Sequence, residues 1–248
     1  ELIRTPQVST EVIVKAPGDW CSELDMQIEQ HIRQRLLQRC PDHCVWGEET
    51  HTTAPINDLL NASQVWVIDP IDGSMNFLRG YPQYAISIAL VVNGQPVAAC
   101  IADPVRGEVF SAAAGGGAQC NGVRLQTSQT QRLSSALGAT VFPKPAASFM
   151  STYLRELNLV LTQTAGLRRA GSMALELAYL AAGRIDVFWE RGMGPWDAAA
   201  GWLLIQEAGG KVWSLDGLDW RASQVLAASN APLQQDWHHL LIGAGDST

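Results

Sequence analysis

Residues 66–77 have the sequence Trp66-Val67-Ile68-Asp69-Pro70-Ile71-Asp72-Gly73-Ser74-Met75-Asn76-Phe77. An apolar stretch typical of a β-strand leads into Asp69 and Pro70, and because proline has no N–H to donate, we expect the strand to end at Asp69. Gly73 allows a tight turn, and Ser74 is a favourable N-cap for a helix. Carboxylates bind Mg²⁺, and the N–H groups at a helix start bind phosphate. The segment therefore predicts a site for phosphate ester chemistry.

Two other segments add acidic residues. Glu48 and Glu49 directly follow the apolar residues 45–46 and Gly47. Asp197 stands at the head of an alanine-rich helical pattern that runs as far as Glu207. Each of these acids alone could belong to a solvated loop or to a helix start, so only their combination with residues 66–77 indicates a metal site.

The three segments together resemble the inositol monophosphatase family, within the lithium-sensitive, magnesium-dependent phosphatase superfamily. The resemblance rests on Gly-Glu-Glu, Asp-Pro-Ile-Asp-Gly-Ser-Met-Asn-Phe and Trp-Asp-Ala-Ala-Ala-Gly in the family's order, with Cys120-Asn121-Gly122 before a strand and Glu207-Ala208-Gly209-Gly210 near the end. It extends from about Lys15 to the last residue. The resemblance implies a layered α-β-α-β-α sandwich with the active site between its two halves.

The composition is that of a globular protein, with 248 residues, 47% hydrophobic and 17% charged. The formal net charge of −7 leaves no basic surface excess for nucleic acid or for an anionic membrane. We therefore expect neither a nucleic-acid nor a membrane partner. An acidic protein that binds a phosphate monoester needs local charge neutralisation, which bound divalent cations provide.

The cysteines and the apolar runs bear on location. The five cysteines are an odd number without a disulfide framework. No signal peptide pattern and no apolar run of roughly 18 residues is present. The sequence therefore predicts a cytoplasmic protein.

The periodicity predicts an α+β first half, residues 1–128, and an α/β second half, residues 129–248. In the first half Ser22 is expected to cap a helix over 23–37, and antiparallel hairpins follow the strand at 65–68, with strands at 85–93, 96–103 and 107–113. In the second half, strands are expected near 139–142, 166–169, 185–190 and 211–214, and helices near 147–157, 174–182 and 198–208.

The resemblance also implies a ligand set for Mg²⁺. Glu48, Asp69 and the main-chain carbonyl of Ile71 would hold a first ion, and Asp69, Asp72 and Asp197 a second, with Asp69 shared. Glu48 would also help to hold a weaker third ion. This set suits Mg²⁺, which prefers a few carboxylates together with waters and substrate phosphate.

The remaining site residues act on the water and the substrate. Ser74 stands where the family usually has threonine, and its hydroxyl, bonded to Asp25, would orient the nucleophilic water. The catalytic set is thus Asp25, Glu48 and Ser74. The N–H groups of Gly73 and Ser74 are expected to cradle the phosphate. The resemblance assigns Asp72 and Glu190 to hydroxyl groups of the substrate and places Ser172 and Met173 at the rim.

The resemblance implies a Mg²⁺-dependent phosphomonoesterase, sensitive to lithium and homodimeric, that acts on inositol monophosphate or a related polyol or sugar phosphate. Fructose 1,6-bisphosphatase, histidinol phosphatase and 3′-phosphoadenosine 5′-phosphate phosphatase activities are alternatives on the same site. Asn76-Phe77 favours the inositol branch, and Glu190 favours a polyhydroxylated substrate. A different class is a regulatory protein that binds RNA or the transcription machinery. The intact metal set argues against a purely regulatory role.

Overall fold

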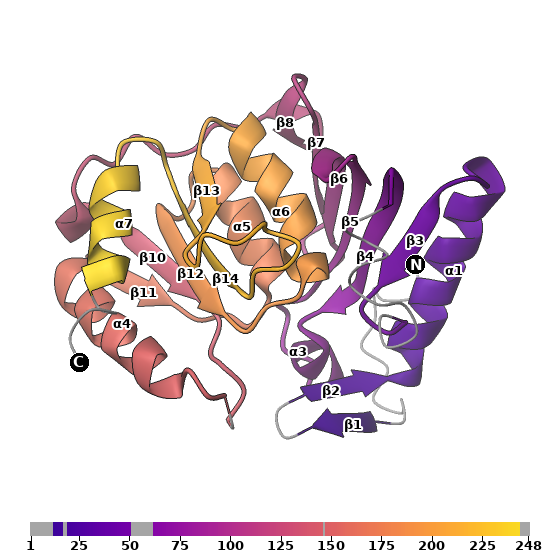
Figure 1. Cartoon of the computed structure of the whole chain (residues 1–248), viewed down its shortest axis with the longest axis horizontal. Helices are drawn as coiled ribbons and strands as arrows, with labels where there is room; N and C mark the ends of the chain where they lie inside the picture. The colour runs from indigo at the N-terminus through magenta and orange to yellow at the C-terminus, as the bar shows by residue number, and fades with distance from the viewer. Residues whose placement is uncertain (1–11, 17–18, 51–61, 146, 244–248) are drawn as a thin grey trace.

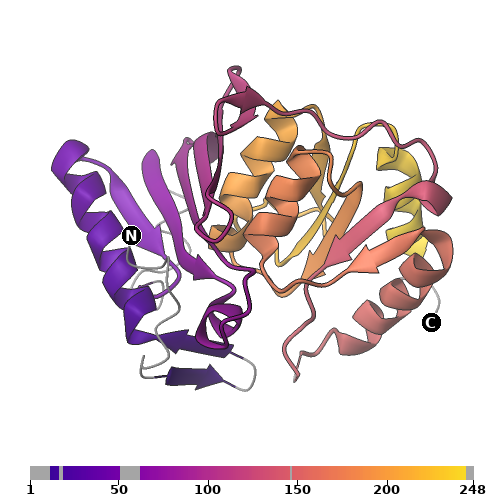
Figure 2. The same ribbon diagram turned by 180° about the vertical axis from the view of Figure 1, so that it is seen from behind.

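The structure, a computed structural model, describes residues 12–16, 19–50, 62–145 and 147–243. Its elements form five layers (Figures 1 and 2). Helix α1 (Glu23–Arg39) covers the outer face of a seven-stranded sheet, and α5 (Met173–Ala181) and α6 (Pro195–Glu207) lie between this sheet and a five-stranded one. Helices α4 (Met150–Gln163) and α7 (Gln234–Gly243) cover the far side. The predicted α-β-α-β-α sandwich is confirmed.

The seven-stranded sheet has its strands in sequence order, β3 to β9. β3 and β4 are parallel, and every later pair is antiparallel, as the predicted hairpins require. Buried and half-buried residues alternate along β5, the pattern of a strand with one face in the core. The strands are β3 (Cys44–Gly47), β4 (Gln64–Asp72), β5 (Ala85–Val92), β6 (Gln95–Asp103), β7 (Glu108–Ala113), β8 (Gly117–Cys120) and β9 (Val123–Arg124).

The prediction that the strand ends at Asp69 is wrong, because β4 continues to Asp72. Asp69 pairs with Ser87 and Asp72 with Ala85, so three steps on β4 match two on β5. The extra residue makes a bulge, where a strand tolerates a proline without its N–H. Residues three apart on a regular strand point to opposite faces, so the bulge places Asp69 and Asp72 on the same face.

The five-stranded sheet has the order β11-β10-β12-β14-β13. β10 lies between two parallel neighbours, and β14 is antiparallel to both of its own. The predicted strands and helices are present with ends shifted by a few residues, but β14 and α7 were not predicted as elements. The strands are β10 (Leu137–Thr140), β11 (Gly166–Arg168), β12 (Val187–Arg191), β13 (Lys211–Ser214) and β14 (Val225–Ser229).

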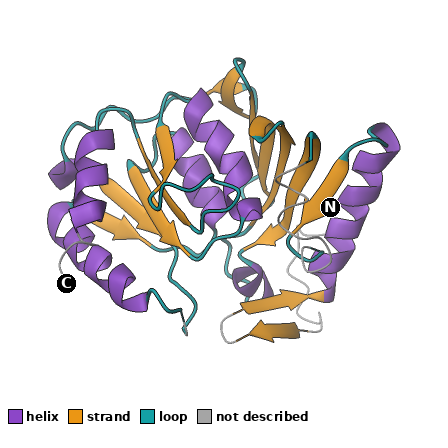
Figure 3. Cartoon of the chain, in the orientation of Figure 1, coloured by secondary structure: helices purple, strands orange, loops and turns teal. Residues whose placement is uncertain are grey.

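Three smaller features remain in the described part of the chain: a two-stranded hairpin, a short helix and a 3-10 turn. The hairpin and the short helix lie beside the site. A hairpin of β1 (Val12–Ala16) and β2 (Asp19–Ser22) contacts α3 (Ser74–Leu78) at one end of the sandwich (Figure 3). A 3-10 turn, η2 (Leu133–Ser135), lies in the connection between the sheets. None of the helices in the described ranges is long and apolar enough to cross a membrane.

Helices α5 and α6 pack closely at small residues. Ala198, Ala199 and Ala200 are buried, and a Cβ atom on Gly201 would lie 2.3 Å from Leu177 Cδ1 and 2.5 Å from Leu177 Cβ. Both helices also contact strands of both sheets. The division into halves at residue 128 stays a prediction, since this shared helical layer joins them.

Candidate active site

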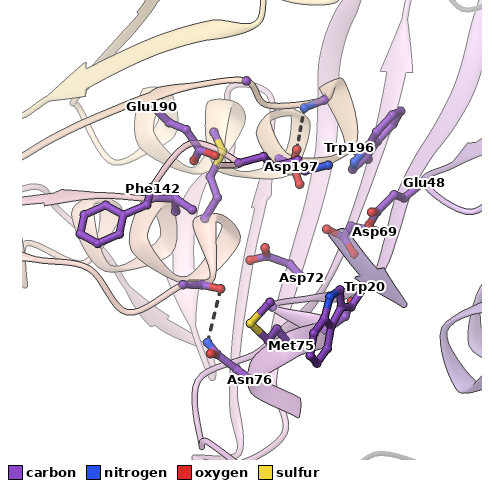
Figure 4. A pocket seen from close by; sticks show the side chains of 18 of the residues that line it. Trp20, Glu48, Asp69, Asp72, Met75, Asn76, Phe142, Glu190, Trp196 and Asp197 are labelled. Atoms are coloured by element: carbon purple, nitrogen blue, oxygen red, sulfur yellow. Dashed lines mark hydrogen bonds between the residues drawn. The ribbon is translucent and has the colours of Figure 1, made fainter. Parts of the chain in front are cut away.

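Three carboxylates converge between the two sheets. Asp69 and Asp72 extend from the bulged end of β4, and Asp197 lies in the first turn of α6. One oxygen atom of each lies within 4.8 Å of the other two, and Figure 4 shows the three side chains facing a common space with Glu48 beside Asp69. The structure therefore brings together four of the residues expected to bind Mg²⁺.

Hydrogen bonds fix two of these acids and leave oxygens available. Asp72 Oδ2 accepts from the Ser172 hydroxyl at 2.5 Å and from Ala174 N at 2.7 Å. Asp197 is the third residue of α6, and its Oδ2 accepts a hydrogen bond of 2.6 Å from the N–H of the N-cap residue, Gly194. Asp69 Oδ1 is buried and has no hydrogen-bond partner in the described part of the chain. A buried charged oxygen without a partner is costly, and a divalent cation would satisfy it.

The pKa values of all four acids are raised, in each case mainly by burial. Burial, followed by the charge of Asp197, raises the pKa of Glu48 to about 8, although Lys15 opposes the shift. Burial and the charge of Asp72 raise the pKa of Asp197 to about 7, and burial raises that of Asp72 to about 6. The pKa of Asp69 rises well above its usual range through burial and through Glu48. Such a cluster favours a cation.

This repulsion predicts how the metal-free protein responds to pH. Because the folded-state pKa of each acid is raised, the cost of ionisation grows as the pH rises through the folded-state values, about 6 to 8 for Asp72, Asp197 and Glu48, and is relieved as the pH falls toward the usual carboxyl range. We expect the protein in a chelating buffer to melt several degrees higher at about pH 6 than at about pH 8.5. Mg²⁺ should raise the melting temperature more at the higher pH.

Calorimetry at the two pH values measures both effects. The Asp69→Asn protein is the comparison, since it lacks one of the repelling charges and should show a smaller pH difference. A carboxylate metal site would be contradicted if Mg²⁺ raised the melting temperature equally at both pH values and by the same amount in the Asp69→Asn protein.

Ser74 begins α3 rather than capping it. The N-cap residue is Gly73, with φ at +90°, so the expectation that Ser74 is the cap is wrong. The Ser74 hydroxyl instead lies 2.8 Å from Asp25 Oδ1 and 2.8 Å from the carbonyl oxygen of Ile71. The N–H and the hydroxyl of Ser22 donate to Asp25 Oδ2 at 2.8 and 2.5 Å, as expected at the start of α1. Asp25 is therefore held in place behind the Ser74 hydroxyl.

Sequence reasoning missed Glu29, which supports the Glu48 loop. It lies on α1 and is buried, and its Oε2 accepts from Glu49 N at 2.8 Å. A Cβ atom on Gly47 would lie 2.1 Å from the Glu29 carboxyl carbon, so any larger residue there would displace the Glu29 carboxylate. Lys15 holds the same loop from the opposite side, at 3.4 Å from Glu48 and 2.7 Å from Glu49. A helical period alone does not distinguish Glu29 from a solvated acid.

Two of the residues expected to touch the substrate, Ser172 and Glu190, are buried. Ser172 is fully buried with its hydroxyl donated to Asp72, so its expected place at the rim is wrong and it orients that carboxylate instead. Glu190 is 8% exposed, its Oε2 has no hydrogen-bond partner among the described residues, and burial raises its pKa well above the usual range. Glu190 can therefore accept a hydrogen bond from a substrate hydroxyl when it is ionised, or donate one to it when it is protonated.

One cavity, of about 310 Å³, connects the carboxylates with Glu190. This volume is at the lower end of small-molecule sites, which suits a substrate of sugar size. Asp25 lies outside the lining, behind Ser74. The expected site residues that line the cavity are Glu48, Asp69, Ile71, Asp72, Gly73, Ser74, Met173, Glu190 and Asp197.

Asn76 joins α3 to the opposite wall of the cavity. Its Nδ2 lies 2.7 Å from the carbonyl oxygen of Gln83, 2.8 Å from that of Ala170 and 3.3 Å from that of Gly171. Figure 4 draws one of these bonds. These contacts hold the start of α3 against the loop that precedes α5. Asn76 on α3 and Asp72 on β4 therefore both hold this loop in place relative to Gly73.

The five-layered sandwich and the acidic cluster agree with the family that the sequence comparison identifies. The model of the inositol monophosphatase family matches residues 4–246, and the chain belongs to this family. The inositol-1-monophosphatase of Rhizobium meliloti is 42% identical over 206 residues, covering 83% of this chain and 75% of that protein. The Nus factor SuhB of Pseudomonas aeruginosa is 44% identical over 205 residues, covering 82% and 75%.

A solved structure shows the same fold. The extragenic suppressor protein SuhB of Bartonella henselae superposes with a TM-score of 0.86 at 35% identity, and the match covers 95% of this chain and 90% of that one. The predicted family is thereby confirmed, and the chain is a phosphatase of the inositol monophosphatase fold.

Proposed function

We propose that this phosphatase uses Mg²⁺ to hydrolyse inositol monophosphate or a related small polyol or sugar phosphate. The observation that carries the proposal is the convergence of Asp69, Asp72 and Asp197 within 4.8 Å, with a buried, unpaired oxygen on Asp69. The cytoplasmic location, the homodimer and the sensitivity to lithium that the sequence predicts belong to the same proposal.

The residues present fit Mg²⁺, because their donors are hard carboxylate oxygens set close together. Glu48, Asp69, Asp72, Asp197 and the carbonyl of Ile71 would hold it. When bound, Mg²⁺ supplies charge neutralisation on the phosphoryl oxygens and a lowered pKa for a coordinated water.

The chain's own groups position the reactants. Ser74 Oγ has one proton and two acceptors at 2.8 Å, Asp25 Oδ1 and the Ile71 carbonyl, so its lone pairs can accept a hydrogen bond from an attacking water while Asp25 orients the hydroxyl. The N–H groups of Gly73 and Ser74 lie at the start of α3, where a helix has no internal partner for them, and would bind phosphate oxygens. Glu190, on the opposite wall, would bind a hydroxyl group of the leaving alcohol.

Phosphate release with and without Mg²⁺ tests the proposal directly. The panel should contain inositol 1-phosphate, fructose 1,6-bisphosphate, histidinol phosphate and 3′-phosphoadenosine 5′-phosphate. We expect Mg²⁺-dependent release from a polyol phosphate. No release from any of the four would refute the proposed activity, and the preferred substrate identifies the branch of the superfamily.

Glu190→Gln tests the substrate class, since Glu190 lines the cavity but is not one of the three carboxylates that converge within 4.8 Å. A charge-assisted hydrogen bond to a hydroxyl contributes about 1.5–3 kcal/mol, so kcat/KM for inositol 1-phosphate should fall roughly 10- to 100-fold. p-Nitrophenyl phosphate has no ring hydroxyls and is the control, with a much smaller expected loss. Equal losses on the two substrates would mean that Glu190 acts through the metal site.

A role in transcription is the second candidate, and the names of the relatives favour it. Several relatives at 39–44% identity are called Nus factor SuhB. Pull-down from purified transcription complexes, with Asp69→Asn as an inactive bait, separates this role from catalysis. Binding that persists in the inactive variant would support a second role, and no binding by either form would exclude it.

A further inference from the structure

One wall of the cavity is built from residues at the carboxyl ends of three parallel strands. Phe142 follows β10, Arg169 directly follows β11, and Glu190 lies near the end of β12. Ligands bind outside the carboxyl ends of the strands in parallel sheets. All three residues line the same cavity as the carboxylates, and Phe142 and Glu190 are labelled in Figure 4.

The two arginines that line the cavity in the described part of the chain differ in their partners. Arg191 donates to both oxygens of the buried Glu156, at 2.5 to 3.0 Å, so its charge is already neutralised. Arg169 has neither an ion pair nor a hydrogen bond to any described residue. Its five N–H donors are therefore available at the mouth of the cavity.

The Arg169 guanidinium is nevertheless held in position. Its carbon lies 4.8 Å from the centre of the Phe142 ring, a cation–π contact, and Phe142 packs edge-on against Tyr153, which is buried. Phe142 itself is 50% exposed, although a large apolar side chain is usually buried. A stacked guanidinium presents its donors in a fixed plane, which suits the two oxygens of a phosphate or carboxylate.

Contacts with Gly171 place this guanidinium near the reacting phosphate. Arg169 Nη1 lies 3.1 Å from the position a Cβ on Gly171 would take, and the Gly171 carbonyl lies 3.1 Å from the corresponding position on Gly73. Gly73 provides one of the N–H groups expected to cradle the phosphate. Gly171 therefore lies between Arg169 and Gly73.

The floor and the rim of this wall offer different chemistry. Glu190 lies at the buried floor and suits a hydroxyl group. Arg169 lies at the exposed rim, and Lys144 adds a second positive charge to the lining. The charge of Lys144 opposes the rise in the pKa of Asp197. A rim with positive charge over an acidic floor attracts a ligand that is anionic at its outer end.

We propose that Arg169, stacked on Phe142, forms a subsite for a second anionic group, so that the preferred substrates are small phosphomonoesters that also carry another phosphate or a carboxylate. This inference rests on the proposed phosphatase activity and narrows its substrate class. It predicts a higher kcat/KM for a six-carbon bisphosphate than for inositol 1-phosphate.

Kinetics of four proteins test the subsite: the wild type, Arg169→Ala, Arg169→Lys and Arg168→Ala. Arg168 is the matched control, since it is an exposed arginine next in sequence that bonds to the Leu167 carbonyl and does not line the cavity. Fructose 1,6-bisphosphate provides a second phosphate, 6-phosphogluconate a carboxylate, and inositol 1-phosphate neither.

Arg169→Ala should reduce kcat/KM for the doubly anionic substrates roughly 10- to 100-fold, mainly through KM. For inositol 1-phosphate the loss should be about threefold or less, as for a screened distant charge. Arg169→Lys should recover part of the loss, because it keeps the charge and lacks the planar fork. Arg168→Ala should match the wild type. Comparing the two doubly anionic substrates shows which anion the subsite prefers.

Two results would overturn the subsite. Equal losses on all three substrates would make Arg169 a structural support for Phe142, and no loss on the doubly anionic ones would leave it a solvated surface charge. If the wild type releases no phosphate, the proposed activity fails. The dissociation constants of fructose 1,6-bisphosphate and inositol 1-phosphate, measured by calorimetry, then still test the subsite. Arg169→Ala should then remove the preference for the bisphosphate, and an unchanged preference would refute it.

Discussion

Replacing Asp69 by asparagine is expected to reduce kcat by a factor on the order of 10³ or more while leaving the fold intact. Asp69 is the central acid of the cluster, almost fully buried, and its Oδ1 has no other partner among the described residues. Asparagine keeps the shape but replaces one charged oxygen with an NH₂ group, which repels a cation. Steady-state phosphate release at saturating Mg²⁺ measures the loss, and circular dichroism confirms the fold.

The matched control is Asp236→Asn, the same substitution at an exposed position in the first turn of α7. It should leave kcat unchanged. Near-normal Mg²⁺-dependent turnover in the purified Asp69→Asn protein would refute the assignment of the metal site.

Gly201→Val is expected to destabilise the fold by about 3 kcal/mol or more, which corresponds to a melting temperature lowered by roughly 6–12 °C. The first added carbon would lie 2.3 Å from Leu177 Cδ1 and 2.5 Å from Leu177 Cβ. The Cδ1 atom can rotate away, but the Cβ atom cannot move without its helix. Helices α5 and α6 would have to separate, and both support the two sheets.

Gly243→Val provides the control for this change. Gly243 is the last residue of α7, and no atom lies within 4 Å of the position that its Cβ would take. Its substitution should change the melting temperature by no more than a degree or two, on the order of a surface change. Equal melting temperatures for the two variants would contradict the tight contact between α5 and α6.

The convergence of the acids could be predicted because the signal is local. Glu48, Asp69 and Asp197 each stand in a short segment with glycine, proline or alanine at defined neighbours, and the order of the segments indicates the family. The β4 bulge could not be predicted in the same way. Proline usually marks the end of a strand, and only pairing with β5 shows that the strand continues.

The supporting contacts could not be predicted because they join distant residues. Glu29 and Glu49 are 20 positions apart, and Ser172 and Asp72 are 100 apart. A single sequence contains no periodic signal for either pair. Arg169 was missed for a related reason: a lone arginine after a strand is ordinarily solvated, and its contact with Phe142 depends on the adjacency of β10 and β11.

The order in which the ribosome makes the chain gives the bond between Ser172 and Asp72 another meaning. Asp69 and Asp72 are synthesised early, but the groups that orient Asp72 are made about a hundred residues later, and Asp197 later still. Helices α5 and α6, which pack against the first sheet, are also made later than its strands. The three carboxylates therefore cannot converge in a nascent chain until α6 has emerged and packed.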